Sequence, residues 1–265
     1  IFHMEAGNRC YDFRVPEEIN RKIVDHTSDV NLVYSDIARE ALLREGLSPD
    51  LIIKTGSPMY EVLNFFRDKI EESDVLERLS LKRENFFLCS LHREENVDSE
   101  ERLKSYVSII NYLNEYYNLP VIFSTHPRTR KQLEKYDLSF RAGVISMKPL
   151  GFFDYVNLQT AAKVVLSDSG TISEESSILN FPALNLRESQ ERHEALEEAI
   201  VPLVGSNIER VFQSIKFLED QGRLENRSLN LVEDYRKPNV SDKVVRIIHS
   251  HTDYVNRVIW RRYDN

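Results

Sequence analysis

The segment LSDSGTISEE, at residues 166–175, has the composition of an anion-binding turn. An apolar strand is followed there by small polar residues and a glycine, and then by a predicted helix. The first N–H groups of a helix are unpaired and carry a partial positive charge, which suits a phosphate group. Ser169 can add a hydroxyl donor, and Glu175 could accept the two hydroxyls of a ribose. The simpler alternative, in which Asp168 and Ser169 only cap the helix and Glu175 is solvated, stays open.

Basic groups follow two further apolar strands. The segment CSLHREEN, at residues 89–96, places His92 and Arg93 directly after a strand, and both side chains can bind phosphate oxygens. A single histidine is more often structural, but the adjacent arginine and the strand-end position favour a functional role for His92. His126 also follows a predicted strand and is a candidate to face the same ligand, whereas the charged residues after it are expected at the surface.

Two glutamates near the start of the sequence could do acid–base chemistry. Glu5 lies in HMEAGNR, where it leaves the end of a predicted strand, and Glu17 lies in PEEINR, where a proline occupies its favoured place at a helix start. Glutamates in the first turn also complement the helix dipole, which is the simpler explanation of Glu17 and Glu18. The alternative is that Glu5 and Glu17 converge on one substrate.

Strands and helices alternate along the chain, which predicts an α/β fold with parallel sheets. We expect strands at residues 30–34, 51–54, 86–91, 121–124, 164–167 and 183–186. We expect helices at residues 36–45, 59–67, 100–116, 152–162, 172–179, 208–218 and 240–247, and around 254–262. Gly56-Ser57-Pro58 is the best candidate for a boundary between two doubly wound domains. Ligands of such domains bind at the carboxyl ends of strands, so we expect the motifs above to line a cleft.

The composition excludes several classes of protein. The chain has 265 residues, is 41% hydrophobic and carries a net charge of -8. It has no run of about 20 apolar residues that would insert into a membrane, and its acidity disfavours non-specific binding to nucleic acid. Cys10 and Cys89 form neither a disulfide framework nor a metal pair, so we expect a reducing, cytoplasmic compartment. Residues 1–4, IFHM, read as the end of a buried strand rather than a signal peptide, so we expect the sequence to open within a domain.

Five motifs in this order resemble the non-hydrolysing UDP-N-acetylglucosamine 2-epimerases: HMEAGNR, PEEINR, HREEN, DSGTISEE and RESQERHE. HMEAGNRC and DYVNRVIW are most similar to the branch that acts on UDP-2-acetamido-2,6-dideoxy-L-hexoses, in the UDP-N-acetyl-L-fucosamine pathway of surface polysaccharides. The resemblance implies two Rossmann-like domains of glycosyltransferase-B (GT-B) type. Residues 1–58 would be the second half of the N-terminal domain, residues 59–245 the UDP-binding domain, and residues 246–265 a helix returning to the first domain. The first half of the N-terminal domain would be absent.

The resemblance also implies the role of each site residue. Glu5 and Glu17 match the family's catalytic glutamates, and His92 would contact the diphosphate and help UDP leave. The substrate would be bound by Ser169 and Gly170 at the diphosphate, Glu175 at the ribose, Tyr155 beside the uracil, and Arg9 and Arg192 in the cleft.

The implied reaction is C2 epimerisation of a UDP-2-acetamido sugar. The C2 hydrogen is not next to a carbonyl, so the family eliminates UDP to a 2-acetamidoglycal and adds it back with the opposite C2 configuration. The resemblance implies a UDP-activated amino sugar as the ligand, a homodimer, and neither metal nor nicotinamide. Two alternatives stay open. A GT-B glycosyltransferase would release UDP stoichiometrically, and a non-catalytic fragment would only bind UDP. Glu5 and Glu17 favour the epimerase, whereas the absent half-domain favours an inactive fragment for this chain alone.

Overall fold

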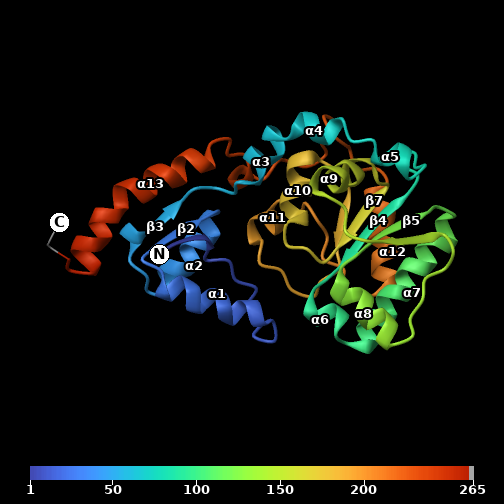
Figure 1. Ribbon diagram of the computed structural model, residues 1–265, viewed down its shortest axis with the longest axis horizontal. Helices are drawn as coiled ribbons and strands as arrows, with labels where there is room; N and C mark the ends of the chain where they lie inside the picture. The colour runs from blue at the N-terminus through green and yellow to red at the C-terminus, as the bar shows by residue number, and fades with distance from the viewer. Residues whose placement is uncertain (263–265) are drawn as a thin grey trace. The chain divides into compact units, whose positions relative to one another are not determined.

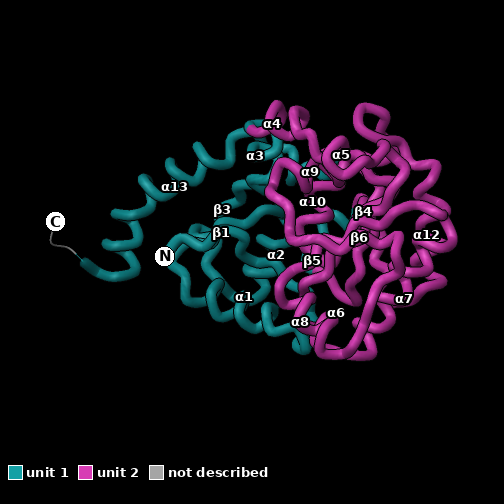
Figure 2. Tube along the Cα trace, turned by 45° about the vertical axis from the view of Figure 1, so that its right-hand side comes forward, with its two compact units in different colours: residues 1–65, 191–197, 231–265 teal, residues 66–190, 198–230 magenta. Residues whose placement is uncertain are grey.

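The protein is described by a computed structural model over residues 1–262. The chain divides into two compact units, which Figure 2 shows in different colours. Unit 1 comprises Ile1–Phe65, Glu191–Glu197 and the segment from Leu231 onward, and unit 2 comprises Phe66–Gln190 and Glu198–Asn230. These limits differ from the domain limits expected after residues 58 and 245. Two later segments belong to unit 1 by their contacts: Glu191–Glu197, which lies between the two parts of unit 2 in the sequence, and the segment from Leu231 onward, which follows them.

Unit 1 is built on a parallel sheet in the order β1-β2-β3. Its strands are β1 (Phe2–Ala6), β2 (Val30–Val33) and β3 (Ile52–Lys54). One face of the sheet packs on α2 through Ala38 and Leu42, and the other packs on Val255 near the end of the chain. Its helices are α1 (Pro16–Thr27), α2 (Asp36–Arg44), α3 (Met59–Phe65), α11 (His193–Glu197) and α13 (Val240–Tyr254), with the short turns η1 (Pro49–Leu51), η2 (Glu233–Tyr235) and η3 (Val255–Ile259).

Unit 2 is built on a five-stranded parallel sheet in the order β6-β5-β4-β7-β8. Its strands are β4 (Phe87–Leu91), β5 (Val121–Thr125), β6 (Val144–Met147), β7 (Val164–Ser167) and β8 (Ala183–Asn185). Successive strands are added on one side of β4 and then on the other, so the connections reverse direction between β4 and β7. In doubly wound sheets, a crevice that binds ligands forms at the carboxyl ends of the two strands beside such a reversal.

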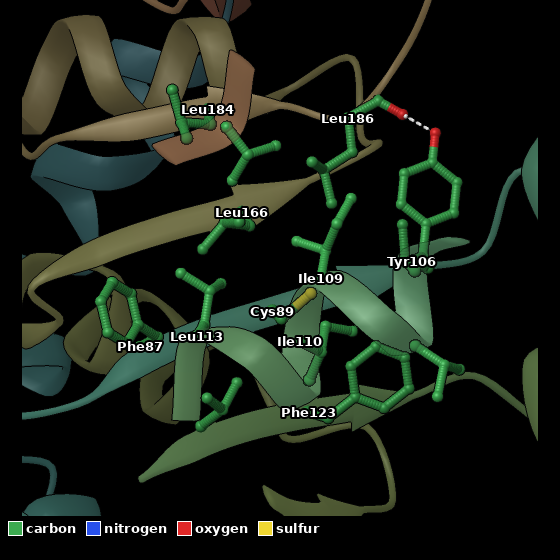
Figure 3. Packing of buried hydrophobic residues seen from close by; sticks show 14 of the residues in the cluster. Phe87, Cys89, Tyr106, Ile109, Ile110, Leu113, Phe123, Leu166, Leu184 and Leu186 are labelled. Atoms are coloured by element: carbon green, nitrogen blue, oxygen red, sulfur yellow. Dashed lines mark hydrogen bonds between the residues drawn. The ribbon is translucent and has the colours of Figure 1, made fainter. Parts of the chain in front are cut away.

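Helices cover both faces of the second sheet. Figure 1 shows α7 and α12 on one side and α9 and α10 on the other. The core beneath α7 contains Leu113, Phe123 and Leu166, and Figure 3 shows the Tyr106 hydroxyl reaching the carbonyl oxygen of Leu186 at its edge. The helices of unit 2 are α4 (Arg67–Glu71), α5 (Val75–Arg78), α6 (Glu94–Val97), α7 (Glu100–Tyr117), α8 (Pro127–Lys135), α9 (Phe152–Ala161), α10 (Ile172–Leu179) and α12 (Ile208–Leu218).

The expected α/β fold with parallel sheets is confirmed, but several elements were not predicted, among them β6, α8 and the short helices α4, α5, α6 and α11. β6 lies at the edge of its sheet and exposes Ile145, so it lacks the apolar run of a buried strand. Helix α8 reads PRTRKQLEK and buries only Thr129 and Leu133, so its sequence resembles a solvated loop. Within residues 1–262, no helix is both long and apolar enough to cross a membrane.

Candidate functional site

The backbone is strained at Glu5, near the end of β1. The register with β2 shifts between Met4 and Ala6, and Glu5 has a φ of 64°, in the left-handed region that a side chain disfavours. A bulge of this kind re-aims a side chain, and the Glu5 side chain stays 40% exposed while the four residues after it are buried. Strained residues persist only where the surrounding structure holds them, and they cluster at functional sites.

Two donors orient the Glu5 carboxylate. The Nη2 atom of Arg192 lies 3.0 Å from Glu5 Oε1, and the Nδ2 atom of Asn8 donates to the same oxygen at 3.2 Å. Arg192 is buried, and its guanidinium carbon lies 5.8 Å from the centre of the Tyr34 ring. The structure therefore brings Arg192 to Glu5 and holds the carboxylate in one direction, as acid–base chemistry requires.

The two other candidates of unit 1 occupy different environments. Glu17 is half-buried in the first turn of α1, while its neighbour Glu18 is fully buried and accepts a hydrogen bond from the Cys10 N–H at 2.8 Å. The start of α1 therefore packs against the loop that follows Glu5. Arg9 was expected in a ligand-binding cleft, but only 1% of its side chain is exposed and its guanidinium pairs with Asp25 and Glu45. Through these two ion pairs, Arg9 ties the loop that follows Glu5 to α1 and to the end of α2.

In unit 2, a paired histidine and aspartate lie at the carboxyl ends of β4 and β7. His92 follows β4 and Asp168 follows β7, and His92 Nδ1 lies 2.8 Å from Asp168 Oδ1. The Asp168 carboxylate is fully buried and also accepts hydrogen bonds from the backbone N–H groups of His92 and Arg93 and from Asn96 Nδ2. It does not cap α10. Asp168 instead links the ends of two strands and fixes the His92 ring.

The balance of interactions keeps Asp168 ionised. Burial raises the pKa of this carboxyl, but the hydrogen bond and charge of His92, with the donors Arg93 and Asn96, outweigh burial, so the pKa lies below its ordinary value. A carboxylate at Nδ1 fixes which imidazole nitrogen carries a proton. The His92 side chain is 40% exposed, so the ring can present Nε2 to a ligand.

The turn before α10 forms a short chain of hydroxyl groups. The Ser169 Oγ atom accepts a hydrogen bond from the Thr171 N–H at 3.3 Å and lies 3.0 Å from Thr171 Oγ1. The Thr171 hydroxyl donates to Glu175 Oε1 at 3.1 Å, and Gln159 Nε2 donates to Glu175 Oε2. Glu175 is buried rather than solvated, and burial raises its pKa despite these two donors. Gly170 lies in the same turn, directly before the helix N-terminus that an anion could approach.

The remaining candidates lie at the same edge of the sheet. Tyr155, on α9, is half-buried and donates its hydroxyl hydrogen to Ser90 Oγ at 3.0 Å, and burial raises the pKa of the phenol. His126 caps α8 by accepting a hydrogen bond from the Arg128 N–H, and its ring centre lies 6.3 Å from that of His92. The structure thus brings His92, His126 and Tyr155 to the strand ends where Ser169 begins its turn.

Two carboxylates organise these sites in ways that the sequence analysis missed. Asp168 was considered only as a helix cap, although its position directly after a buried strand indicates a place at the carboxyl edge of the sheet. Asp25 was not considered at all. It lies on the inner face of α1, fully buried, and binds the loop after Glu5. A single aspartate within a helix offers no local signal of such a contact.

Comparisons with known proteins show which family the chain is similar to. The family model for UDP-N-acetylglucosamine 2-epimerase matches residues 1–249. A structure of UDP-N-acetylglucosamine 2-epimerase from Rickettsia bellii has a TM-score of 0.92 and 46% identity, covering 99% of this chain and 70% of that one. The Methanocaldococcus jannaschii UDP-GlcNAc 2-epimerase, in complex with UDP-GlcNAc and UDP, has a TM-score of 0.86 and 32% identity, covering 94% of this chain and 68% of that one.

A relative with another substrate is also similar. The UDP-2,3-diacetamido-2,3-dideoxy-D-glucuronate 2-epimerase of Pseudomonas aeruginosa is 31% identical over 231 residues, which is 84% of this chain and 63% of that protein. The chain thus spans between three fifths and three quarters of the length of these relatives. Structural neighbours of the fold include GT-B-type epimerases and glycosyltransferases. Because the family model covers nearly all of the sequence, the chain belongs to the UDP-N-acetylglucosamine 2-epimerase family.

Proposed function

We propose that the protein epimerises a UDP-2-acetamido sugar at C2 by eliminating UDP and adding it back. The single observation that carries this proposal is Glu5, held in a strained conformation beside Arg192 in a chain of this epimerase family. A glycosyltransferase needs no such base for a hydrogen on the sugar ring. The chemistry requires a base at C2 and stabilisation of the departing diphosphate, and the described residues offer a group for each.

In the proposed first step, a carboxylate takes the proton from C2. Glu5 is our first candidate for this base, and Glu17 is the second. The electrons of the C2–H bond form the C1=C2 double bond as the C1–O bond breaks, and UDP leaves with the oxygen. The His92 imidazolium and the N-terminus of α10 would stabilise the charge that develops on the diphosphate, together with Ser169. In the reverse addition, the C1=C2 electrons take a solvent-derived proton on the other face of C2, and the diphosphate oxygen bonds to C1 again.

The mechanism predicts that solvent hydrogen enters the product at C2. During turnover in D2O, we expect deuterium at C2 of the epimerised sugar, detected by NMR or mass spectrometry. Glu5→Gln should lower turnover about 10²–10⁴-fold, because the amide cannot accept the proton. Glu17→Gln tests the second candidate, and Glu40→Gln, an exposed glutamate of α2, is the matched control. Turnover without deuterium at C2 would contradict the mechanism, and full activity in both Glu5→Gln and Glu17→Gln would contradict the assignment of the base.

The role of Glu175 in nucleotide binding can be tested apart from turnover. We expect calorimetric titration with UDP to show binding, and we expect Glu175→Ala to weaken it about tenfold or more, because the variant loses the acceptor proposed for the ribose. Glu209→Ala, in the first turn of α12, removes a glutamate from the same unit and should bind UDP normally. Equal UDP affinity in wild type and Glu175→Ala would show that Glu175 does not contact the nucleotide.

For the sugar, we infer a UDP-2-acetamido-2,6-dideoxy-L-hexose in surface-polysaccharide biosynthesis. HMEAGNRC and DYVNRVIW support this branch, at residues 3–10 and 253–260. The diacetamido-glucuronate relative supports the view that enzymes similar to this chain act on more than one UDP-sugar. The measurement is kcat/KM for the L-talosamine-configured UDP-sugar against that for UDP-GlcNAc. We expect a higher kcat/KM for the L-sugar. A higher kcat/KM for UDP-GlcNAc would contradict the assignment to this branch.

A further inference from the structure

We propose that Asp25, on α1, is a positioning residue that holds the Glu5 carboxylate in its working direction through the loop at residues 6–9. The inference rests on the proposed function, in which Glu5 is the base at C2. It adds a buried carboxylate that touches no reacting atom and acts through the backbone that carries Glu5.

The first observation is the set of contacts around Asp25. The carboxylate is fully buried on α1, and its Oδ2 atom accepts a hydrogen bond from the Gly7 N–H at 3.2 Å. The same oxygen lies 2.7 Å from Arg9 Nη1, and the other oxygen lies 2.8 Å from His3 Nδ1. His3 precedes Glu5 on β1, while Gly7 and Arg9 follow it. Asp25 therefore contacts the chain on both sides of the proposed base.

The second observation is a further set of contacts that holds Arg9. Its Nε and Nη2 atoms donate to the two carboxylate oxygens of Glu45 at 2.8 and 2.7 Å, and its Nη1 atom donates to the carbonyl oxygen of Asn8 at 2.9 Å. Paired donors of this kind fix a guanidinium in direction as well as in place. Asn8 in turn donates to Glu5 Oε1, so the contacts run from Asp25 through Arg9 and Asn8 to the carboxylate itself.

The third observation is that this loop has a conformation it would not keep alone. Glu5 and Gly7 both have positive φ, 64° and 81°. A non-glycine residue is disfavoured in the left-handed region, so the surrounding contacts must hold it there. Asp25 is the only carboxylate among the described contacts of unit 1 that binds residues on both sides of Glu5. If Asp25 only stabilised the fold through an ion pair, its contacts would not need to lie on both sides of one strained residue.

The test compares Asp25→Asn with Asp36→Asn in the full-length protein. Asparagine keeps an oxygen for the Gly7 N–H but loses the charge that holds Arg9, and Asp36 is an exposed aspartate of the same unit. We expect Asp25→Asn to lower kcat about 10–100-fold with KM changed less than threefold, because a base displaced by about 1 Å loses about that much rate. We also expect a larger primary isotope effect on kcat with C2-deuterated substrate, which a loss of fold or of substrate binding would not produce. Asp36→Asn should match wild type in all three quantities.

A second variant covers the case in which Asp25→Asn does not fold. Glu45→Gln weakens the hold on Arg9 from a partly exposed position and leaves Asp25 in place, so it should raise the isotope effect in the same direction by a smaller factor. An unchanged kcat and isotope effect in folded Asp25→Asn would overturn the inference. If Asp25→Asn does not fold, an unchanged isotope effect in Glu45→Gln would do so. Failure of the proposed function is separate, since it appears as wild-type turnover without C2 exchange, or as full activity in both Glu5→Gln and Glu17→Gln.

Discussion

At the scale of single residues, the features of interest are two carboxylates that set the direction of other groups. Asp168 is buried between the ends of β4 and β7, and it fixes the ring of His92. Asp25 is buried on α1, accepts a hydrogen bond from the Gly7 N–H after Glu5, and contacts the His3 side chain before it. Both carboxylates are fully buried and surrounded by donors, which is the condition under which burial of a charge is tolerated. In each case the exposed side chain is the one proposed to meet the substrate.

Replacement of Asp168 tests the orientation of His92. We expect Asp168→Asn to lower kcat about 10–100-fold, because an amide cannot stabilise the imidazolium proposed to assist the departure of UDP. UDP binding should change less than threefold, because the turn of Ser169 and the N-terminus of α10 are retained. Steady-state kinetics and calorimetry give the two quantities, with the exposed Asp220→Asn as control. Unchanged kcat in a folded Asp168→Asn would mean that His92 does not depend on this partner.

At the scale of elements, the turn after β1 is shaped by its closeness to α2. A Cβ atom on Gly7 would lie 2.3 Å from the carbonyl oxygen of Ala38, and Gly7 has a φ of 81°. Both facts require glycine, since the backbone of α2 cannot withdraw without breaking its packing on β1 and β2. The backbones after β1 and at the start of α2 therefore approach so closely at Gly7 that no side chain fits there.

Replacement of Gly7 should accordingly be severe. We expect Gly7→Ala to lower the free energy of unfolding by more than about 2 kcal/mol, because it adds a steric clash to an unfavourable φ. Gly46→Ala is the control: Gly46 also has a positive φ, 87°, but no atom lies within 4 Å of the added Cβ. Denaturant unfolding of both variants separates the clash from the backbone effect. A loss in Gly7→Ala no larger than that in Gly46→Ala would contradict the close-contact explanation.

At the scale of the whole molecule, two units with separate sheets are formed by one chain that returns to unit 1 after unit 2. The single tryptophan, Trp260, lies in unit 1 and donates a hydrogen bond to Asp29, so its fluorescence reports on that unit alone. Far-UV circular dichroism reports on both units. The two signals together can therefore assign a loss of structure to one unit.

Acid should weaken unit 1 through Glu45. The hydrogen bond from Arg9 is the largest cause that lowers the pKa of this carboxyl, to about 2, with burial opposing it and His26 adding to it. A depressed pKa stabilises the fold above the unfolded value near 4.5, and this contribution is lost as the pH falls toward 2. We expect it to be about 2 kcal/mol, allowing for partial exposure.

Glu45→Gln should remove this pH dependence. At pH 7 the variant should be less stable than wild type, and the difference should shrink between about pH 4.5 and 2, as followed by Trp260 fluorescence in urea. Glu40→Gln, in an exposed pair with Arg44, should behave as wild type. A stability difference that stays constant down to pH 2 would show that the Glu45 charge is not responsible.

Local pattern was enough to predict much of this protein. β7 and α10 lie within the predicted limits, because an apolar run and a small polar turn mark both without reference to other segments. The same pattern placed His92 and Ser169 at strand ends. The sequence analysis missed β6 and α8, because an edge strand and a charged helix bury too few side chains to produce a periodic signal.

By itself, the sequence determined the α/β class, the strand ends that carry His92 and Ser169, and the family resemblance. Only the tertiary structure decided that Arg9 is buried, that Asp168 holds His92, that Arg192 reaches Glu5, and that Asp25 binds the loop after β1. The physical reason is that the spacing of apolar residues and the residue types of a turn depend only on residues close together in the chain. The partner of a buried charge instead depends on which distant segments pack together, and that is decided by the core as a whole.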